Sequence, residues 1–380
     1  MTSTTSTTHL RQGLARELAA RGLLTDPARR AAVEAVLREL FLGDVVFRSN
    51  GTHWEPARRE QLGEDEWLRM VYSDTTWVTQ VDGISAQEAA GPVSGRPTSS
   101  STLPSLVVRM LELADIREGD RVLEIGTGTG YSTAVLCHLL GDEAVYSVEY
   151  DQELAATAAQ HLRAAGRSPH LVVGDGLGGH QDGADYDTVI ATCAVRTIPP
   201  SWLWQLRDGG SITTTISGWM LGSGLIRLVL DEEGVARGRF AADPVSYMLA
   251  RPHERPPRPT FYAHPGSTRT ARMSPDLLDD WTGLFVAQLG APSAELVRTA
   301  AGPALVDAAT GSQAWTEPDG NGWTVHQDGP LRLWDQVEDA LDAWQQAGAP
   351  DQMAFGMTVT EWDQVVWLGA PEGPCWRLPV

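Results

Sequence analysis

Apolar and polar positions follow two different periods in the middle of the chain. From residue 104 to residue 217, stretches with apolar residues at helical spacing alternate with short apolar runs that are typical of buried strands. The predicted helices are PSLVVRMLELA, YSTAVLCHLL, DQELAATAAQHLRAAG and PPSWLWQL, and the predicted strands are RVLEIG, AVYSVE, HLVVGD, YDTVIAT and SITTTIS. Such alternation implies crossover units and a parallel sheet covered on both faces. The pattern therefore predicts a doubly wound, mostly parallel α/β core over residues 101–252.

The segments on either side of this core differ from it in character. Residues 10–41 carry apolar positions at helical spacing before and after Asp26-Pro27, which predicts two helices. The following stretch is poor in periodicity and rich in turn residues, so we expect residues 1–100 to form a helical and covering region. On the other side, GLIRLVLDEEGVARGRF followed by VSYMLAR predicts an antiparallel hairpin at one edge of the sheet, with Glu233-Gly234 in its turn.

A proline-rich stretch predicts a domain boundary. Residues 251–259 read RPHERPPRP, a composition that holds neither a helix nor a central strand, and we take residues 253–259 as a linker. Residues 260–380 then form a separate acidic α+β domain, with predicted helices SPDLLDDWTGLFVAQL and LWDQVEDALDAWQQAG and predicted strands FGMTVT and QVVWLG. Eight of the 14 tryptophans lie here. For Trp334 and Trp344, on one predicted helix, core packing is the default expectation and a peptide-docking surface is the alternative.

Composition excludes several classes of protein. The chain has 380 residues, with 29 Lys and Arg against 49 Asp and Glu, so its formal net charge is −20 and its pI is about 4.8. With no basic run longer than Arg29-Arg30, this balance argues against a nucleic-acid-binding surface. No apolar stretch approaches the roughly 18 residues of a membrane-spanning helix, and the start lacks the features of a signal peptide, so we expect a cytoplasmic protein without a membrane partner. The scattered cysteines and histidines predict no metal site and no disulfide.

The segment VLEIGTGTGY carries the main chemical signal. Gly126, Gly128 and Gly130 form a G-x-G-x-G loop directly after a predicted buried strand and before a predicted helix. A backbone without Cβ atoms lets a ligand approach closely at the carboxyl edge of a parallel sheet. Dinucleotide enzymes and methyltransferases share this loop, so the motif alone does not separate them. A purely structural tight turn is the remaining alternative.

Three acidic companions of the loop favour S-adenosylmethionine. Glu124 lies inside the strand before the loop. Its negative charge would repel a pyrophosphate, but it could interact with a cationic ligand group through the loop backbone or water. Glu149 ends the second predicted strand and has the chemistry to accept both hydroxyls of a ribose. Asp175-Gly176, after the third strand, offers an acceptor for an adenine amino group and room for the ring. Solvated strand ends are the alternative for Glu149 and Asp175.

The sequence resembles the protein-L-isoaspartate O-methyltransferases. The resemblance covers roughly residues 10–250 and rests on ARGLLTDPARRAAVEAVLRELF, VYSD, VLEIGTGTGYSTAVL, VYSVEYDQELA, VVGDG and YDTVIATCAVRTIP, with Gly209-Gly210 before SITTTIS. It implies a Rossmann-like class I methyltransferase fold and an S-adenosylmethionine-dependent carboxyl O-methyltransferase. The cofactor-binding residues that it implies are Glu124, Gly126, Thr127, Gly128, Tyr131, Glu149, Tyr150, Asp175 and Gly176.

The same resemblance suggests where the acceptor carboxylate is held. The family carries a Ser two residues before a Pro in a motif like T-I-S-x-P, and here the corresponding position is Thr102, preceded by Ser101. Both are candidate catalytic residues, with Asp74 and Arg196 as candidate substrate-binding residues. Thr102 could instead cap the helix that begins near Pro104. An exposed turn is the alternative for Asp74, and an ordinary surface position is the alternative for Arg196.

Three departures from the family narrow the expected substrate. The methyl group of Thr102 makes the site tighter, and Arg196 stands in the loop after the fourth predicted strand, where repair enzymes usually carry small residues and Pro. We also expect the carboxy-terminal 130 residues to have no counterpart in repair enzymes.

Members of the family that carry such a C-terminal extension, ending in a segment like TVTEWDQVVWLGAPEGPCWRLP, are associated with modified ribosomal peptides. They resemble the methyltransferases of ATP-grasp ester/amide-linked peptides (graspetides) and, more loosely, those of lanthipeptides. This implies a monomer that methylates an aspartate of a modified ribosomal peptide, whose ester closes to an aspartimide. The rivals are a general isoaspartate repair enzyme and a non-catalytic peptide-binding adaptor.

Overall fold

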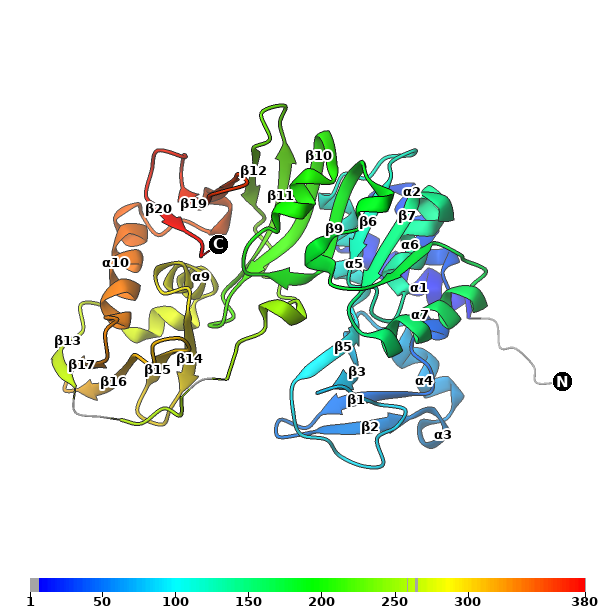
Figure 1. The fold of residues 1–380 in the computed structure, drawn as a ribbon. Coiled ribbons are helices and arrows are strands. Elements are labelled where there is room, and N and C mark those ends of the chain that lie inside the picture. Colours follow the sequence, from blue (N-terminus) through cyan, green and yellow to red (C-terminus); the bar gives the residue numbers. More distant parts are fainter. Residues whose placement is uncertain (1–6, 258, 264–265, 380) are drawn as a thin grey trace. The chain divides into compact units, whose positions relative to one another are not determined.

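The computed structural model describes residues 7–257, 259–263 and 266–379 and divides into two compact units (Figure 1). The N-terminal unit comprises the chain up to Thr192 together with Gln205–Arg207. The C-terminal unit comprises Cys193–Trp204 and the chain from Asp208 onward. No helix within the described ranges is long and apolar enough to span a membrane.

The N-terminal unit contains the predicted parallel sheet. Its strands are β6 (Val122–Ile125), β7 (Val145–Glu149), β8 (His170–Val173) and β9 (Tyr186–Val195). They pair in the order β9-β6-β7-β8, all parallel. The helices between and before them are α5 (Pro104–Leu113), α6 (Tyr131–Leu140) and α7 (Gln152–Ala164). All seven elements lie where the sequence predicts them, and the loops that follow β6, β7 and β8 meet at one edge of the sheet.

The amino-terminal helices also match the prediction. They are α1 (Thr8–Ala20) and α2 (Pro27–Ala35), followed by the short 3-10 helix η1 (Arg38–Phe41). Asp26 begins α2, because its side chain accepts a hydrogen bond from the backbone N–H of Ala28 at 2.8 Å and Pro27 has no N–H to satisfy. Helix α2 packs against both α1 and α6.

A second, antiparallel sheet in this unit is absent from the sequence prediction. Its strands are β1 (Val45–Ser49), β2 (Trp54–Arg58), β3 (Trp77–Val81), β4 (Ile84–Ser85) and β5 (Pro97–Ser101), with α3 (Arg59–Leu62) and α4 (Glu64–Val71) between β2 and β3. The order is β2-β1-β3-β4, and β5 also pairs with β3. The strands are short, and WEPAR and PTSSS contain proline and polar residues, so neither shows the alternation that marks a strand in sequence.

The C-terminal unit combines an antiparallel sheet with a smaller separate one. The first contains β10 (Leu206–Ser217), β11 (Ser223–Leu230), β12 (Ala236–Phe240), β18 (Phe355–Val359), β19 (Gln364–Leu368) and β20 (Cys375–Arg377), each paired antiparallel with the next. The second has the order β13-β17-β16-β15-β14. Its strands are β13 (Ser267–Thr270), β14 (Ala294–Arg298), β15 (Pro303–Asp307), β16 (Gln313–Asp319) and β17 (Gly322–Asp328). The helices are α8 (Pro200–Trp204), α9 (Trp281–Gly290) and α10 (Leu333–Gln346).

The short 3-10 helices complete the list of elements. Besides η1 they are η2 (Asp142–Ala144), η3 (Gly176–Gly178), η4 (Gln181–Gly183), η5 (Arg251–His253), η6 (Pro275–Asp279) and η7 (Gln352–Ala354).

The predicted hairpin and terminal strands exist, but they share one sheet. Strands β11 and β12 form the hairpin, and Gly234 in its turn has a φ of 77°. Strand β12 then pairs with β18, so that Ala236 lies opposite Val359. The predicted division at the linker, residues 253–259, therefore does not coincide with the division into compact units. Pairing between strands so far apart in the chain leaves no mark in local composition.

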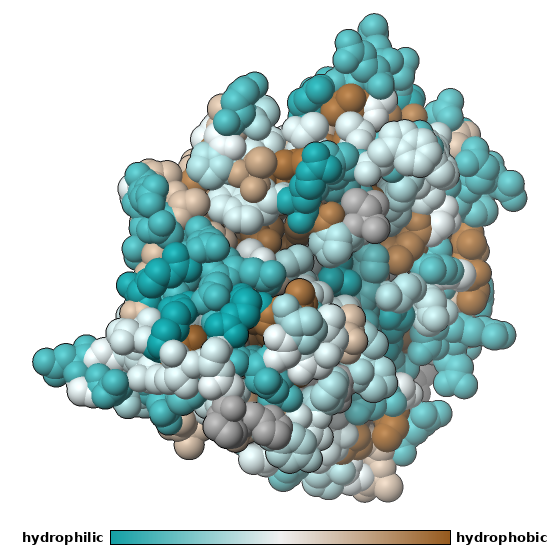
Figure 2. All heavy atoms as spheres, turned by 60° about the vertical axis from the view of Figure 1, so that its left-hand side comes forward, coloured by the Kyte–Doolittle hydropathy of each residue, from teal (hydrophilic) through white to brown (hydrophobic). Residues whose placement is uncertain are grey.

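The tryptophans of α10 pack in the core, as expected by default. Trp334 is 1% exposed and Trp344 is 5% exposed, and the indole N–H of Trp344 donates to the carbonyl oxygen of Pro350 at 2.8 Å. By contrast, Trp362 is 82% exposed. Figure 2 shows hydrophobic residues scattered over the face in view rather than gathered in one patch. The abundance of tryptophan in this part of the chain therefore reflects mainly packing.

Candidate functional site

The glycine loop leaves β6 in a conformation that side chains would oppose. Gly126, Gly128 and Gly130 have φ values of 94°, 55° and 89°, a region that favours glycine. The backbone N–H of Gly126 donates to the carbonyl oxygen of Val148 in β7 at 2.8 Å. A Cβ at Gly126 would lie 2.9 Å from Oγ1 of Thr192, which itself donates to the carbonyl oxygen of Gly126 at 2.6 Å. Thr192, which the sequence analysis did not single out, thus holds the loop from β9.

Glu124 supports the loop from inside the protein. Its carboxylate is fully buried and accepts hydrogen bonds from the hydroxyls of Ser132 at 2.5 Å, Thr133 at 2.5 Å and Ser147 at 2.7 Å. Burial raises the pKa of Glu124, although these three hydrogen bonds act in the opposite direction. The hydroxyl of Thr127 in turn lies 2.7 Å from that of Ser147. Glu124 therefore ties β6, β7 and α6 together beneath the loop.

Glu149 closes β7 directly beside the glycine loop. Its side-chain oxygens accept from the backbone N–H of Gly128 at 2.8 Å and from that of Asp151 at 3.1 Å. Glu149 is 8% exposed, whereas the neighbouring Tyr150 is 53% exposed. Asp151 begins α7 by accepting from the backbone N–H of Glu153. The structure thus brings two of the predicted cofactor-binding features, the glycine loop and Glu149, into direct contact.

The end of β8 approaches the end of β6. A Cβ at Gly176 would lie 2.5 Å from Cγ2 of Ile125, so the chain passes there too closely for any side chain. Asp175 is exposed, and its carboxylate accepts from the backbone N–H of Leu177 at 2.9 Å. The carboxylates of Asp175 and Glu149 therefore both lie along the edge formed by the carboxyl ends of the parallel strands. Such edges are the usual ligand-binding edges of doubly wound sheets.

Strand β5 delivers the candidate acceptor segment to the same loop. A Cβ at Gly128 would lie 3.6 Å from the carbonyl oxygen of Ser100, an ordinary van der Waals contact. Ser101 is 1% exposed, and its hydroxyl has no hydrogen-bond partner among the described residues. Thr102 is half-buried. It does not cap α5, because the N-cap residue is Leu103 and no side chain of that position bonds the helix.

Asp74, a predicted substrate-binding residue, does not lie in an exposed turn, and it fixes the start of α5. One of its carboxylate oxygens accepts from the backbone N–H of Ser105 at 2.8 Å, and the other lies 2.6 Å from the guanidinium of Arg21. The Asp74 side chain is 8% exposed and that of Arg21 is 47% exposed. Asp74 therefore satisfies a backbone donor at a helix start from a distant loop.

Tyr131 is enclosed rather than facing solvent. It is 3% exposed and begins α6, and its ring meets that of Phe41 edge to face at 6.0 Å. The guanidinium of Arg38 lies over the same ring, 5.6 Å from its centroid. Burial raises the pKa of Tyr131. Arg38 is a buried cation that no local sequence pattern indicated.

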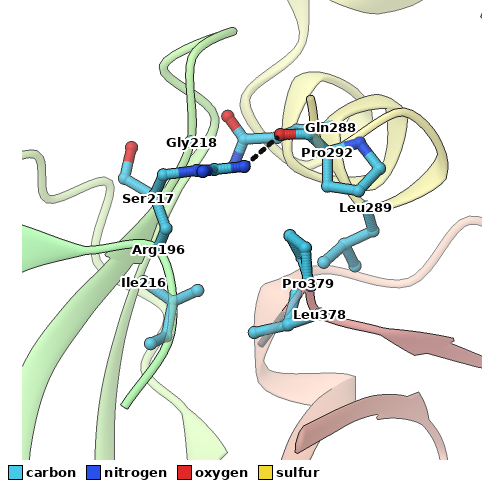
Figure 3. A pocket seen from close by; sticks show the side chains of 9 residues that line it. All are labelled: Arg196, Ile216, Ser217, Gly218, Gln288, Leu289, Pro292, Leu378 and Pro379. Atoms are coloured by element: carbon cyan, nitrogen blue, oxygen red, sulfur yellow. Dashed lines mark hydrogen bonds between the residues drawn. The ribbon is translucent and has the colours of Figure 1, made fainter. Parts of the chain in front are cut away.

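Arg196 lies in the C-terminal unit and is already engaged there. Its guanidinium stacks on the ring of Trp219, 3.8 Å from the centroid. It also donates to the carbonyl oxygen of Pro292 at 3.0 Å, the bond drawn as a dashed line in Figure 3. Burial lowers its pKa. The hollow around it is lined by Arg196, Ile216, Ser217, Gly218, Gln288, Leu289, Pro292, Leu378 and Pro379. An ordinary surface position is therefore not what the structure shows for Arg196.

Comparison with known proteins identifies the family. The family model for protein-L-isoaspartate(D-aspartate) O-methyltransferase matches residues 59–220. A protein-L-isoaspartate O-methyltransferase of Ignicoccus hospitalis is 38% identical over 154 residues, covering 40% of this chain and 65% of the relative. Protein-L-isoaspartate O-methyltransferase 1 of Archaeoglobus fulgidus is 34% identical over 193 residues, covering 50% of this chain and 80% of the relative. The chain belongs to the protein-L-isoaspartate O-methyltransferase family.

Membership in this family confirms the predicted enzyme class and cofactor at the level of the family. The chain spans just under two thirds of the Ignicoccus relative, 65% of its length. The relatives named here are isoaspartate methyltransferases, so a place in the subgroup that modifies ribosomal peptides stays a prediction.

A solved structure confirms the fold and corrects one expectation. It is a protein-L-isoaspartate O-methyltransferase with a TM-score of 0.54 and 20% identity, and the likeness covers 92% of this chain and 96% of that one. This confirms the class I methyltransferase fold. The uncovered 8% is much shorter than residues 260–380, so most of that segment does have a counterpart in fold. The expectation that it has none in repair enzymes was wrong, because at this low identity the likeness is not visible in sequence.

Proposed function

We propose that the protein is an S-adenosylmethionine-dependent carboxyl O-methyltransferase that acts on isoaspartyl residues of proteins or peptides. Family membership supports this proposal, and one observation in the structure carries it. A Cβ built at Gly128 would lie 3.6 Å from the carbonyl oxygen of Ser100, so the segment that leads to Thr102 passes near the glycine loop, and Glu149 bonds the same loop. This proximity supports the proposal that the candidate acceptor hydroxyl and the candidate cofactor residues form one site in the N-terminal unit.

The residues at the edge of the parallel sheet fit S-adenosylmethionine. The glycines let the chain pass closely at this edge, since a Cβ at Gly126 would lie 2.9 Å from Oγ1 of Thr192 and one at Gly176 would collide with Ile125. When bound, the cofactor supplies a methyl group on a positively charged sulfur. Glu149 would accept from the ribose hydroxyls in place of its present loop partners, and Asp175 from the adenine amino group. Glu124 would act through the loop that it supports, because its own oxygens are occupied by hydroxyls.

The chemistry asks little of the protein beyond placement. A carboxyl group with a pKa of about 3.9 is ionised at neutral pH and needs no general base to act as a nucleophile. Correct placement of reacting groups can supply on the order of 7 to 11 kcal/mol. Thr102 would hold one oxygen of the acceptor carboxylate while the other faces the methyl group. The tight packing of Ser101 at the end of β5 would restrict how far Thr102 moves.

Mass spectrometry tests the proposal directly. The protein is incubated with S-adenosylmethionine and a peptide that contains isoaspartate, and a gain of about 14 Da is expected. The matched control is the same peptide with ordinary aspartate, which should gain nothing. Thr102→Ala should leave cofactor affinity unchanged, as measured by calorimetry, and lower turnover at least about 10-fold, while Thr102→Ser should retain activity. Absence of methylation by a protein that binds the cofactor would refute the isoaspartyl substrate.

The modified ribosomal peptide is a narrower candidate substrate. Thr102 in place of the family's serine is the observation that favours it, because the additional methyl group restricts the site. The C-terminal extension no longer adds support, since a similarly folded segment occurs in a solved isoaspartate methyltransferase. Methylation of a macrocyclic peptide together with failure on linear isoaspartyl peptides would favour this candidate. A protein that binds no S-adenosylmethionine would instead support the adaptor alternative.

A further inference from the structure

Arg38 is the most deeply buried cation near the proposed acceptor segment. It begins η1 and is 0% exposed. Its two terminal nitrogens donate to four backbone carbonyl oxygens of the described residues: Val71 at 2.7 Å, Ser73 at 2.9 Å, Thr75 at 2.9 Å and Thr102 at 3.2 Å. The planar fork of a guanidinium suits several fixed acceptors better than an ammonium does. One side chain thus joins the loop at residues 71–75 to Thr102.

The charge of Arg38 is not neutralised by a direct ion pair. No carboxylate within the described ranges lies in salt-bridge distance of its guanidinium, although Asp74 acts on it from further away. Burial lowers the pKa of Arg38 to about 10, which leaves it charged at neutral pH. A buried charge of this kind costs several kcal/mol unless hydrogen bonds and neighbouring groups compensate. Four carbonyl oxygens and the face of Tyr131 compensate the terminal nitrogens, whereas the buried Nε has no hydrogen-bond partner among the described residues.

The backbone around Thr102 is held at three points. Arg38 binds the carbonyl oxygen of Thr102, the hydroxyl of Thr76 accepts from the backbone N–H of Leu103 at 3.1 Å, and Asp74 accepts from that of Ser105. The hydroxyl of Thr102 itself makes no hydrogen bond with any residue in the described part of the chain. A residue that binds a ligand oxygen is expected to have a fixed backbone and a hydroxyl that is available for a new hydrogen bond, and Thr102 has both.

We propose that Arg38 is a positioning residue for the acceptor carboxylate: it fixes the backbone at Thr102 and contributes a positive charge beside it. This inference rests on the proposed methyltransferase function. It also addresses the net charge of −20, since an acceptor carboxylate approaching so acidic a protein needs a local cation. Arg38 does not touch the acceptor, because its guanidinium is enclosed and bound to backbone carbonyls.

Two substitutions separate the charge from the geometry. Arg38→Lys keeps the charge and loses the fork, whereas Arg38→Gln keeps two N–H donors and loses the charge. We expect Arg38→Gln to raise the KM for an isoaspartyl peptide about 10-fold and to lower kcat/KM about 100-fold, because misplacement of about 1 Å has that effect. Arg38→Lys should have a KM close to that of the wild type but a kcat that remains lowered. The dissociation constant for S-adenosylmethionine should change less than about 3-fold in both.

Arg29→Met is the matched control. Arg29 is also largely buried, with its side chain 13% exposed, but it pairs with Asp26 and reaches the carbonyl oxygen of Ile116. Its loss should lower the melting temperature without changing KM. Arg38 variants that bind the cofactor and share the kinetic constants of Arg29→Met would overturn the inference. A wild-type protein that methylates no isoaspartyl peptide would overturn the proposed function first, so the two failures are distinguishable.

Discussion

The bond between Asp74 and the start of α5 permits a quantitative prediction. Asp74→Ala removes a helix-capping acceptor, worth about 1 kcal/mol, and a partner of Arg21, worth about 0.5 kcal/mol because Arg21 is half exposed. The free energy of unfolding should therefore fall by about 1.5 kcal/mol. For a unit of this size that corresponds to roughly 3 to 6 °C in melting temperature.

Two further variants divide this loss into its parts. Asp74→Asn keeps an oxygen that can accept from the backbone N–H of Ser105, and Arg21→Met keeps the whole cap, so each should cost only about 0.5 kcal/mol. Thermal unfolding followed by circular dichroism measures all three. A melting temperature for Asp74→Ala within about 1 °C of the wild type would refute the capping role. A raised KM with unchanged stability would restore the original expectation that Asp74 binds substrate.

Other predictions concern the cofactor edge and the C-terminal unit. Glu149→Ala should weaken S-adenosylmethionine binding at least about 10-fold by calorimetry, because it removes a bidentate acceptor and frees the loop. Gly176→Ala should lower stability by about 1 to 3 kcal/mol through its clash with Ile125, whereas Gly174→Ala, with nothing within 4 Å, is the control and should be nearly neutral. Burial tends to raise the pKa of Asp307, but hydrogen bonds to its carboxylate leave that pKa lowered, so its stabilising contribution is present above its unfolded pKa of about 3.9 and is lost as pH falls through the lower folded value. Urea titrations from pH 5 to pH 2.5 should therefore show a shallower decline for Asp307→Asn than for the wild type.

The alternating part of the fold was predictable because its signals are local. The segment YSTAVLCHLL became α6, Tyr131–Leu140, and Asp26-Pro27 marked the start of α2. The glycine loop and Glu149 were predictable for the same reason, since a strand, a turn and a helix follow one another within a few residues.

The rest of the site depends on contacts between distant segments. Asp74 bonds a backbone N–H that lies 31 residues further on, and Arg38 bonds a carbonyl 64 residues away. A single arginine in a helical pattern gives no indication that it will be buried. The sheet of β1 to β5 and the sheet of β13 to β17 were missed because their strands mix polar and apolar residues, and strand pairing decides their structure.

The pairing of β12 with β18 also sets an order of events during synthesis. More than a hundred residues separate the two strands, which at 5 to 20 residues per second amounts to roughly 6 to 23 s of translation. Until β18 emerges from the ribosome, the edge of β12 presents unpaired backbone groups that other chains can bind. A ribosome that stalls in this interval leaves a nascent chain whose parallel strands are all made but whose hairpin edge is unpaired and open to aggregation.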